Sequence, residues 1–179
     1  MRKLLSIALL FIVTITFAQD EGYKTPPKEI ADLLLAKPTP TVSIDSKAEW
    51  MLLMERNSYP SVEELAQPEF RIAGMRINPN NFGRSRQSYI NNFTLKNIRT
   101  GKEFKVAGLP VPLLAGNISW SPGEKRIGFT HTTNQRIELY VIDVATQKAV
   151  KINKQPLNVI LGEDFTWVDD NTLLYKTTL

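Results

Sequence analysis

Residues 117–152, NISWSPGEKRIGFTHTTNQRIELYVIDVATQKAVKI, decide the fold. Their pattern predicts four short strands, rich in Ile, Val, Tyr, Phe and Trp, at residues 118–120, 126–131, 137–144 and 149–152. The first turn, Ser121-Pro122-Gly123-Glu124, combines a proline that presets φ with a glycine, Gly123, that is free to take positive φ. Four antiparallel strands in about 35 residues are typical of one β-propeller blade, although a β-meander in a sandwich has a similar pattern.

The start of this unit occurs three times in the chain, which favours the propeller over the sandwich. The copies are VSID at residues 42–45, ISWS at 118–121 and FTWV at 165–168, each followed by a polar turn and an apolar return strand. Trp120 and Trp167 lie 47 positions apart (167 minus 120), close to the period of about 40–50 residues of a propeller blade. The sequence therefore predicts an all-β, incomplete β-propeller of about two four-stranded blades plus the first hairpin of a third.

The same pattern divides the chain into segments. A proline-rich leader at residues 19–41 contains KEIADLLLA, whose apolar residues are spaced as one helical face. A second short helix is expected at SVEELA, residues 61–66, where Ser61 and Glu64 have capping-box spacing. We expect a first blade at 42–106 with a helical or loop insertion at 57–88 that shows no strand pattern, a second blade at 117–152, and the start of a third at 164–177.

The N-terminus predicts a cleaved signal peptide at residues 1–18. Arg2 and Lys3 precede an apolar stretch, and Thr16-Phe17-Ala18 places small residues so that cleavage falls between Ala18 and Gln19. The alternative is a membrane anchor, but about 14 apolar residues are short for a bilayer core. We therefore expect an exported protein, periplasmic or secreted, with no membrane attachment after cleavage. Removal of Arg2 and Lys3 lowers the formal charge from +4 to +2, which leaves nucleic-acid binding without support.

Several motifs resemble one peptidase family. PPKEI, ELAQPE, AGMRINP, RSR and FTWVDDNTLL, within residues 23–177, are similar to the start of the glutamyl endopeptidases, serine peptidases of the prolyl-oligopeptidase type. The resemblance implies an N-terminal β-propeller followed by an α/β-hydrolase domain with a Ser-Asp-His triad. Two departures stand out: SPGEKR replaces the more usual SPDGK turn, and the hydrolase domain is missing. We therefore expect the front end of a longer peptidase.

The residues themselves offer no catalytic centre. G-x-S-x-G, the turn that presents the nucleophilic serine of such hydrolases, does not occur in the sequence. His131 is the sole histidine and is expected to be a strand-end residue, and one histidine without cysteine makes a zinc site improbable. We predict no catalytic residue, no metal and no cofactor, and no hydrolysis of Glu-containing peptides by residues 19–179 alone.

Arginines in the insertion are the candidate substrate-binding residues. A peptidase that cuts after glutamate needs a cation for the substrate carboxylate, which arginine can hold with two parallel hydrogen bonds. The alternatives are solvated loop arginines or ion pairs with Glu63, Glu64 and Glu69. The candidates, led by Arg84 and Arg86, are Arg71, Arg76, Arg84 and Arg86.

Three functions remain open at this point. The first is a non-catalytic propeller portion that gates access to an exported serine peptidase and contacts its peptide substrate, with the missing hydrolase domain as partner. The alternatives are a stand-alone exported β-repeat binding module and a structural β-domain. Because an open ring exposes strand edges and apolar faces, we expect Leu173, Leu174 and Tyr175 to face water and the isolated chain to self-associate.

Overall fold

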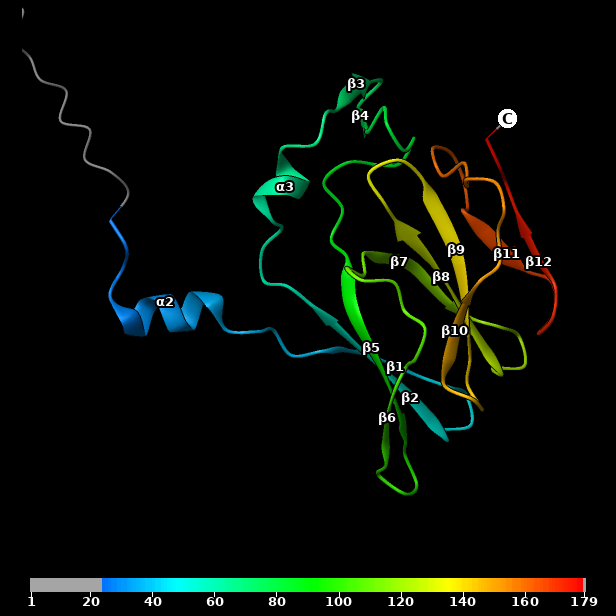
Figure 1. The fold of residues 1–179 in the computed structure, drawn as a ribbon. Helices are drawn as coiled ribbons and strands as arrows, with labels where there is room; N and C mark the ends of the chain where they lie inside the picture. Colours follow the sequence, from blue (N-terminus) through cyan, green and yellow to red (C-terminus); the bar gives the residue numbers. More distant parts are fainter. Residues whose placement is uncertain (1–23, 179) are drawn as a thin grey trace, which may run out of the picture. The chain divides into compact units, whose positions relative to one another are not determined.

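The computed structural model describes residues 24–178 and divides the chain into two compact units, residues 1–35 and 36–179. The predicted cleavage point between Ala18 and Gln19 lies outside the described residues. Strands dominate the described part of the chain (Figure 1). Its helices are α2 (Lys28–Leu35) and α3 (Val62–Leu65). Its strands are β1 (Thr41–Ile44), β2 (Trp50–Arg56), β3 (Phe70–Ile72), β4 (Met75–Ile77), β5 (Ile90–Asn97), β6 (Glu103–Lys105), β7 (Ala115–Trp120), β8 (Arg126–Thr132), β9 (Ile137–Asp143), β10 (Lys148–Lys151), β11 (Phe165–Trp167) and β12 (Leu173–Tyr175).

The strands form two four-stranded antiparallel units and a hairpin, which confirms the predicted fold class. The first unit, called repeat 1, pairs β1, β2, β5 and β6 in that order. Repeat 2 pairs β7, β8, β9 and β10, and repeat 3 consists of the hairpin β11–β12. Repeats 1 and 2 pair edge to edge between β5 and β7 at Ile90 and Ala115, and a second bridge joins Ala107, which follows β6, to Lys148 in β10. Figure 1 shows the three repeats following one another across unit 2.

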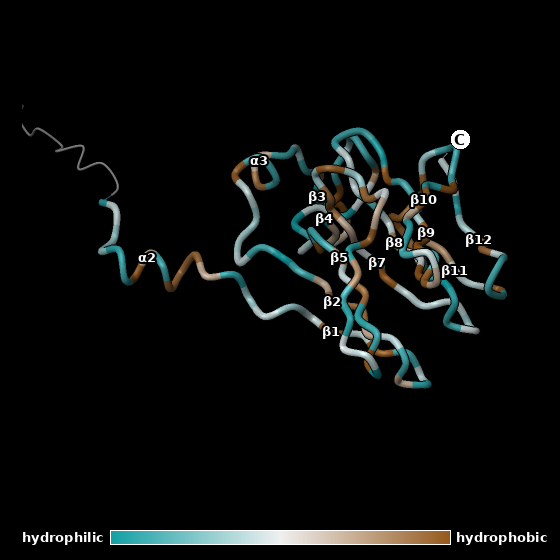
Figure 2. The backbone as a smooth tube through the Cα atoms, turned by 60° about the horizontal axis from the view of Figure 1, so that its bottom comes forward, coloured by the Kyte–Doolittle hydropathy of each residue, from teal (hydrophilic) through white to brown (hydrophobic). Residues whose placement is uncertain are grey.

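Each pair of neighbouring repeats encloses its own apolar core. Between repeats 1 and 2 the rings of Phe93 and Phe129 meet at a centroid distance of 5.0 Å. Between repeats 2 and 3, Leu139 and Leu157 pack with Phe165. Repeat 2 is thus covered on both faces, and β8 is buried along nearly its whole length instead of on alternate residues. Figure 2 shows the hydrophobic segments concentrated in these strands and the hydrophilic ones in the connections.

The turns that open repeats 1 and 2 have the same backbone hydrogen bonds. Asp45 N–H donates to Trp50 O at 3.1 Å, and Ser121 N–H donates to Arg126 O at 2.8 Å. Each turn contains one residue with positive φ, Ala48 at 53° and Glu124 at 59°. Gly123 does not use its freedom to take positive φ, since the residue with positive φ in this turn is Glu124. Glycine is needed there for space, because a Cβ at Gly123 would lie 2.2 Å from a carboxylate oxygen of Asp170.

Polar contacts between repeats are periodic and point in one direction. The indole of Trp120 in repeat 2 donates to Ser43 Oγ of repeat 1 at 2.8 Å. The indole of Trp167 in repeat 3 donates to Ser119 O of repeat 2 at 3.3 Å. Both donors hold the third position of the repeated motif, and both acceptors belong to the serine at its second position.

Carboxylates in the turns follow the same rule. Glu124 in the repeat 2 turn accepts from the amide and hydroxyl of Ser46 in the repeat 1 turn, at 2.7 and 2.6 Å. Asp170 in the repeat 3 turn accepts from the Ser121 hydroxyl and the Gly123 amide of repeat 2, both at 2.7 Å. Repeats 2 and 3 are therefore each bound to the preceding repeat by an indole and a carboxylate of their own.

The insertion of repeat 1, residues 57–88, contains a helix and a hairpin. Helix α3 has the predicted capping box, in which Glu64 N–H donates to Ser61 Oγ and Ser61 N–H donates to the Glu64 carboxylate. The expectation that the insertion has no strands is wrong, because β3 pairs with β4. Their two-residue turn, Ala73-Gly74, has positive φ at both positions (49° and 82°), which matches the twist of paired strands.

The exposure of repeat 3 was predicted in part correctly. Leu174 is 63% exposed, as expected for a hairpin whose outer face has no partner among the described residues, and Tyr175 is 39% exposed. Leu173 instead packs against the core between repeats 2 and 3. The reason is strand alternation, which turns Leu173 and Leu174 to opposite faces of β12.

Unit 1 contributes helix α2, where Pro27 O accepts the amides of Ile30 and Ala31 at 3.0 Å each. Lys28 and Asp32 form an ion pair one turn apart, and Leu33 is exposed. Among residues 24–178, no helix has the length and apolar character needed to cross a bilayer.

Candidate ligand-binding site

The insertion is hydrogen-bonded to the loop between β8 and β9, and the residues of this contact line the candidate site. Asn81 is buried, and its side-chain amide donates to Thr133 O at 2.9 Å. The same side chain accepts the Gly83 amide at 2.9 Å. A Cβ at Gly83 would lie 2.6 Å from the side chain of Ile137. Glycine therefore lets the insertion of repeat 1 lie directly against repeat 2.

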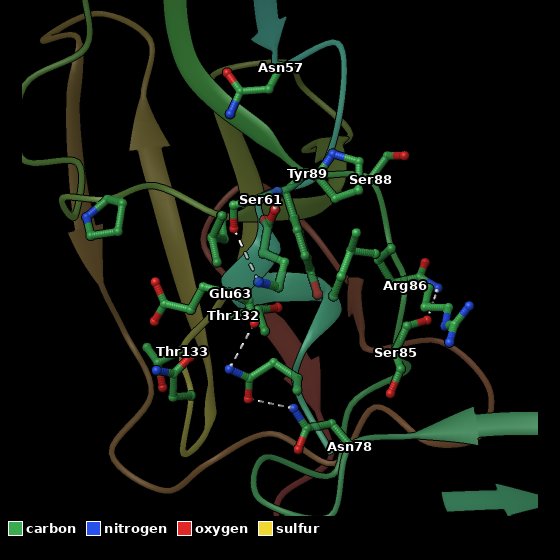
Figure 3. Close-up of a pocket in the computed structure, with 18 of the residues that line it drawn as sticks. Asn57, Ser61, Glu63, Asn78, Ser85, Arg86, Ser88, Tyr89, Thr132 and Thr133 are labelled. Carbon is green, nitrogen blue, oxygen red and sulfur yellow. Dashed lines mark hydrogen bonds between the residues drawn. The ribbon is translucent and has the colours of Figure 1, made fainter. Parts of the chain in front are cut away.

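A cavity of about 870 Å³ lies beside this contact. Figure 3 shows Ser85 and Arg86 on one side of it, Thr132 and Thr133 on the other, and the ring of Tyr89 between them. A second cavity of about 460 Å³ adjoins the first and extends toward repeat 3. The lining is rich in amide and hydroxyl groups, which suits the hydrogen-bonding groups of a peptide. The residues that line both cavities are Arg84, Gln87, Ser88, Tyr89 and Thr132.

Three of the four candidate arginines pair with one carboxylate, that of Glu69. Arg86 holds it with Nε at 3.0 Å and Nη2 at 3.2 Å. Arg71 Nη2 lies at 3.3 Å, and Arg76 also pairs with the same group. Burial acts to raise the pKa of Glu69, but the hydrogen bonds and charges of Arg86 and Arg76 outweigh it and leave the pKa lowered. Arg71, Arg76 and Arg86 therefore form ion pairs with Glu69, one of the two alternatives to substrate binding that the sequence left open.

Arg84 is the exception. Its side chain is exposed, lines both cavities, and makes no hydrogen bond or ion pair with any residue of the range 24–178. Asp164 lines the smaller cavity, and the positive charge of Arg84 acts to lower its pKa. Burial raises the pKa of Asp164, and the charge of Arg84 only partly opposes this effect. Arg84 is therefore the candidate whose guanidinium is available to a ligand.

His131 lines the larger cavity but is held as part of the sheet. Its Nδ1 accepts the Leu114 amide at 3.3 Å, and its ring meets the edge of Tyr140 at a centroid distance of 6.0 Å. Burial lowers the pKa of His131, against the opposing charge of Glu138. The ring is therefore neutral at pH 7 with Nδ1 occupied, which fits the predicted strand residue better than a general base.

Glu138 has cationic neighbours of its own. Its carboxylate accepts Lys151 Nζ at 2.7 Å and Arg136 Nε at 2.8 Å. In the part of the chain that the structure describes, no three acidic or histidine side chains gather as metal ligands.

Sequence reasoning missed the residues that build the cavity. Asn81 and Tyr89 are central to it, and the only signal for Asn81 was the run Asn78-Pro79-Asn80-Asn81, whose side chains hydrogen-bond nearby backbone amides. Ser85 was also missed. Its hydroxyl oxygen is buried and has no hydrogen-bond partner within residues 24–178.

No family model matches the sequence. A rice protein (Oryza sativa subsp. japonica) named probable glutamyl endopeptidase, chloroplastic, is 31% identical over 169 residues, which are 87% of this chain and 18% of the rice protein. The Arabidopsis thaliana protein of the same name is 30% identical over 168 residues, 87% of this chain and 17% of that protein. A solved Bacteroides ovatus chain, assigned as a dipeptidyl aminopeptidase IV, superposes with a TM-score of 0.46 at 12% identity, covering 87% of this chain and 24% of that one.

The repeated strands and their packing define an all-β, propeller-like repeat protein. Its sequence is related to that of the glutamyl endopeptidases, which confirms the resemblance seen in the motifs. The chain spans less than a fifth of the length of these plant relatives.

Proposed function

We propose that this chain is the non-catalytic propeller portion of an exported serine peptidase, where it gates access and binds an acidic side chain of the peptide substrate. The observation that carries the proposal is the guanidinium of Arg84, which lines both cavities and is not paired within the described residues. The plant relatives are named glutamyl endopeptidases, which supports a glutamate side chain as the group that Arg84 receives.

The chemistry of the cavity supports this ligand. A guanidinium binds a carboxylate with two parallel, charge-assisted hydrogen bonds. Asp164 lies near Arg84 but forms no ion pair with it, so the guanidinium stays open to a ligand. Side-chain amides nearby, such as that of Asn91, which donates to Asn57 at 2.7 Å, provide hydrogen-bonding groups for the peptide backbone.

The test is peptide binding to the purified chain, measured by calorimetry with two peptides that differ only by Glu or Gln at one position. We expect the chain to prefer the Glu peptide and Arg84→Gln to abolish the preference. A hydrogen bond to a charged group contributes about 1.5–3 kcal/mol, so affinity for the Glu peptide should fall about 10-fold or more. Arg99→Gln is the matched control, since Arg99 is an exposed arginine in the turn between β5 and β6. Equal affinity of the wild-type chain for both peptides would refute the proposal.

Export and membership of a longer peptidase have separate tests. The proposed mature protein begins at Gln19, so its intact mass in the native host should lack residues 1–18. A retained Met1 in the membrane fraction would contradict export. If the chain is part of a longer peptidase, the coding sequence downstream of codon 179 should continue into a G-x-S-x-G segment. A stop codon would favour the stand-alone binding module.

A further inference from the structure

The Glu69 cluster, formed by Glu69 with Arg71, Arg76 and Arg86, brings three guanidiniums to a single carboxylate. Glu69 is only 16% exposed, whereas Arg71 is 70% and Arg86 54% exposed. Arg86 contacts both carboxylate oxygens of Glu69 with two hydrogen bonds. In charge, the three guanidiniums exceed the single carboxylate by two.

The cluster stands at the wall of the larger cavity. Glu69 and Arg86 both line it, as does Arg84. The segment that carries Arg84 is tied to β4, because Ser85 N–H donates to Arg76 O at 2.9 Å and Asn78 N–H donates to Gly83 O at 2.8 Å. The four arginines thus belong to one small, connected piece of the insertion.

Backbone geometry separates Arg84 from the cluster. Arg84 and Arg86 are two residues apart and would lie on the same side of a regular strand. This segment is not a regular strand, because only Arg84 forms a β-bridge, with Ile77, and Arg86 has positive φ at 60°. Arg86 pairs with Glu69, and Arg84 makes no such pair.

We propose that Glu69 is a specificity-determining residue, an internal carboxylate that occupies three of the four arginines and so limits the cavity to ligands with a single acidic side chain. This inference rests on the proposed binding role of Arg84. With Glu69 charged, the guanidinium of Arg84 is the one of the four that is available to the ligand. Without it, the guanidinium of Arg86, which also lines the larger cavity, would be available beside that of Arg84, and ligands with several carboxylates would be bound in preference.

The test compares a peptide carrying one glutamate with a peptide carrying a run of glutamates. In the wild-type chain we expect the two peptides to bind within about threefold of each other. In Glu69→Gln, the glutamate-run peptide should bind at least about tenfold tighter than to wild type, and its affinity should fall more steeply with salt. Glu69→Asp keeps the charge and should behave as wild type.

The outcomes are separable. If Glu69 had only a structural role, Glu69→Gln would weaken binding of both peptides, and this result would overturn the inference while leaving the role of Arg84 intact. A wild-type preference of more than about tenfold for the glutamate run would also overturn it, because the clustered arginines would then be available, and this measurement requires no variant. If the single-glutamate peptide does not bind better than its Gln analogue, the proposed function itself fails. Circular dichroism of each variant confirms that it is folded.

Discussion

Substitution of Gly128 by alanine tests the packing of repeat 3 on repeat 2. Gly128 lies in β8, on the face toward β11. A Cβ there would lie 2.7 Å from Phe165 Cε2, 2.9 Å from Phe165 Cζ and 3.2 Å from Trp167 Cζ2. Carbon atoms pack best at about 3.5–4.0 Å, so the Phe165 ring would have to withdraw by roughly 1 Å.

The magnitude follows from what the ring can do. Overpacking of a well-packed core costs about 1–3 kcal/mol. If the ring leaves its site completely, the loss is the burial of Phe165, which is only 6% exposed and contributes about 1.5–3 kcal/mol. We therefore expect Gly128→Ala to lower the free energy of unfolding by about 1–3 kcal/mol, a large share of the roughly 5–15 kcal/mol of a typical domain.

Urea unfolding followed by tryptophan fluorescence measures this loss, and hydrogen exchange locates it. Amides of residues 165–175 should exchange faster in the variant, while those of repeat 1 stay unchanged. Gly116→Ala in β7 is the matched control, because its Cβ would meet only Thr130 Oγ1, at an ordinary 3.6 Å. Equal stability of the two variants, with unchanged exchange at β11, would show that these rings do not pack on Gly128.

Ser85→Ala should raise stability by about 1 kcal/mol, because it removes a buried hydroxyl without a partner; a fall in the melting temperature would mean that the hydroxyl is satisfied. Hydrogen bonds from Ser46 to Glu124 and from Ser121 to Asp170 hold the pKa values of these carboxyls below their usual 4.5 and 3.8. Their stabilisation should therefore be complete above about pH 5 and lost as the pH falls through the lowered values, and urea midpoints of Asp170→Asn should depend less on pH. The isolated chain should self-associate, since the outer face of repeat 3 exposes apolar side chains; a monomer in light scattering would contradict this. Residues 19–179 should leave Glu-containing peptides intact, and turnover blocked by a serine-directed inhibitor would prove otherwise.

The repeats could be predicted because their signal is local and periodic. Trp120 and Trp167 hold the same position in strands whose apolar residues alternate, and the structure keeps both the strands and their order. The hairpin β3–β4 was missed although Ala73-Gly74 separates two alternating triplets. Three residues a side fall below the usual strand length of about five to six, so the pattern is too short to stand out.

The candidate site was harder to predict because its geometry depends on distant residues. Arg84 and Arg86 are equivalent in sequence, and the partner of Arg86 lies 17 residues away in a connection without periodicity. Asn81 finds Thr133 at a separation of 52 residues. No local pattern reports such contacts, whereas the composition of the arginine-rich segment did draw attention to the part of the insertion that lines the candidate site.

The contacts between repeats run in the same order as synthesis, because each later repeat brings the side chains that bind the repeat made before it. Repeat 1 leaves the ribosome first, with an acceptor, the hydroxyl of Ser43, and a donor, the hydroxyl of Ser46, still unused. Repeat 2 then brings Trp120 and Glu124 to a partner that is already formed, and repeat 3 does the same with Trp167 and Asp170. Because chains are made and fold from the N-terminus, we expect each repeat to be the template on which the next one settles, so that assembly advances vectorially with translation.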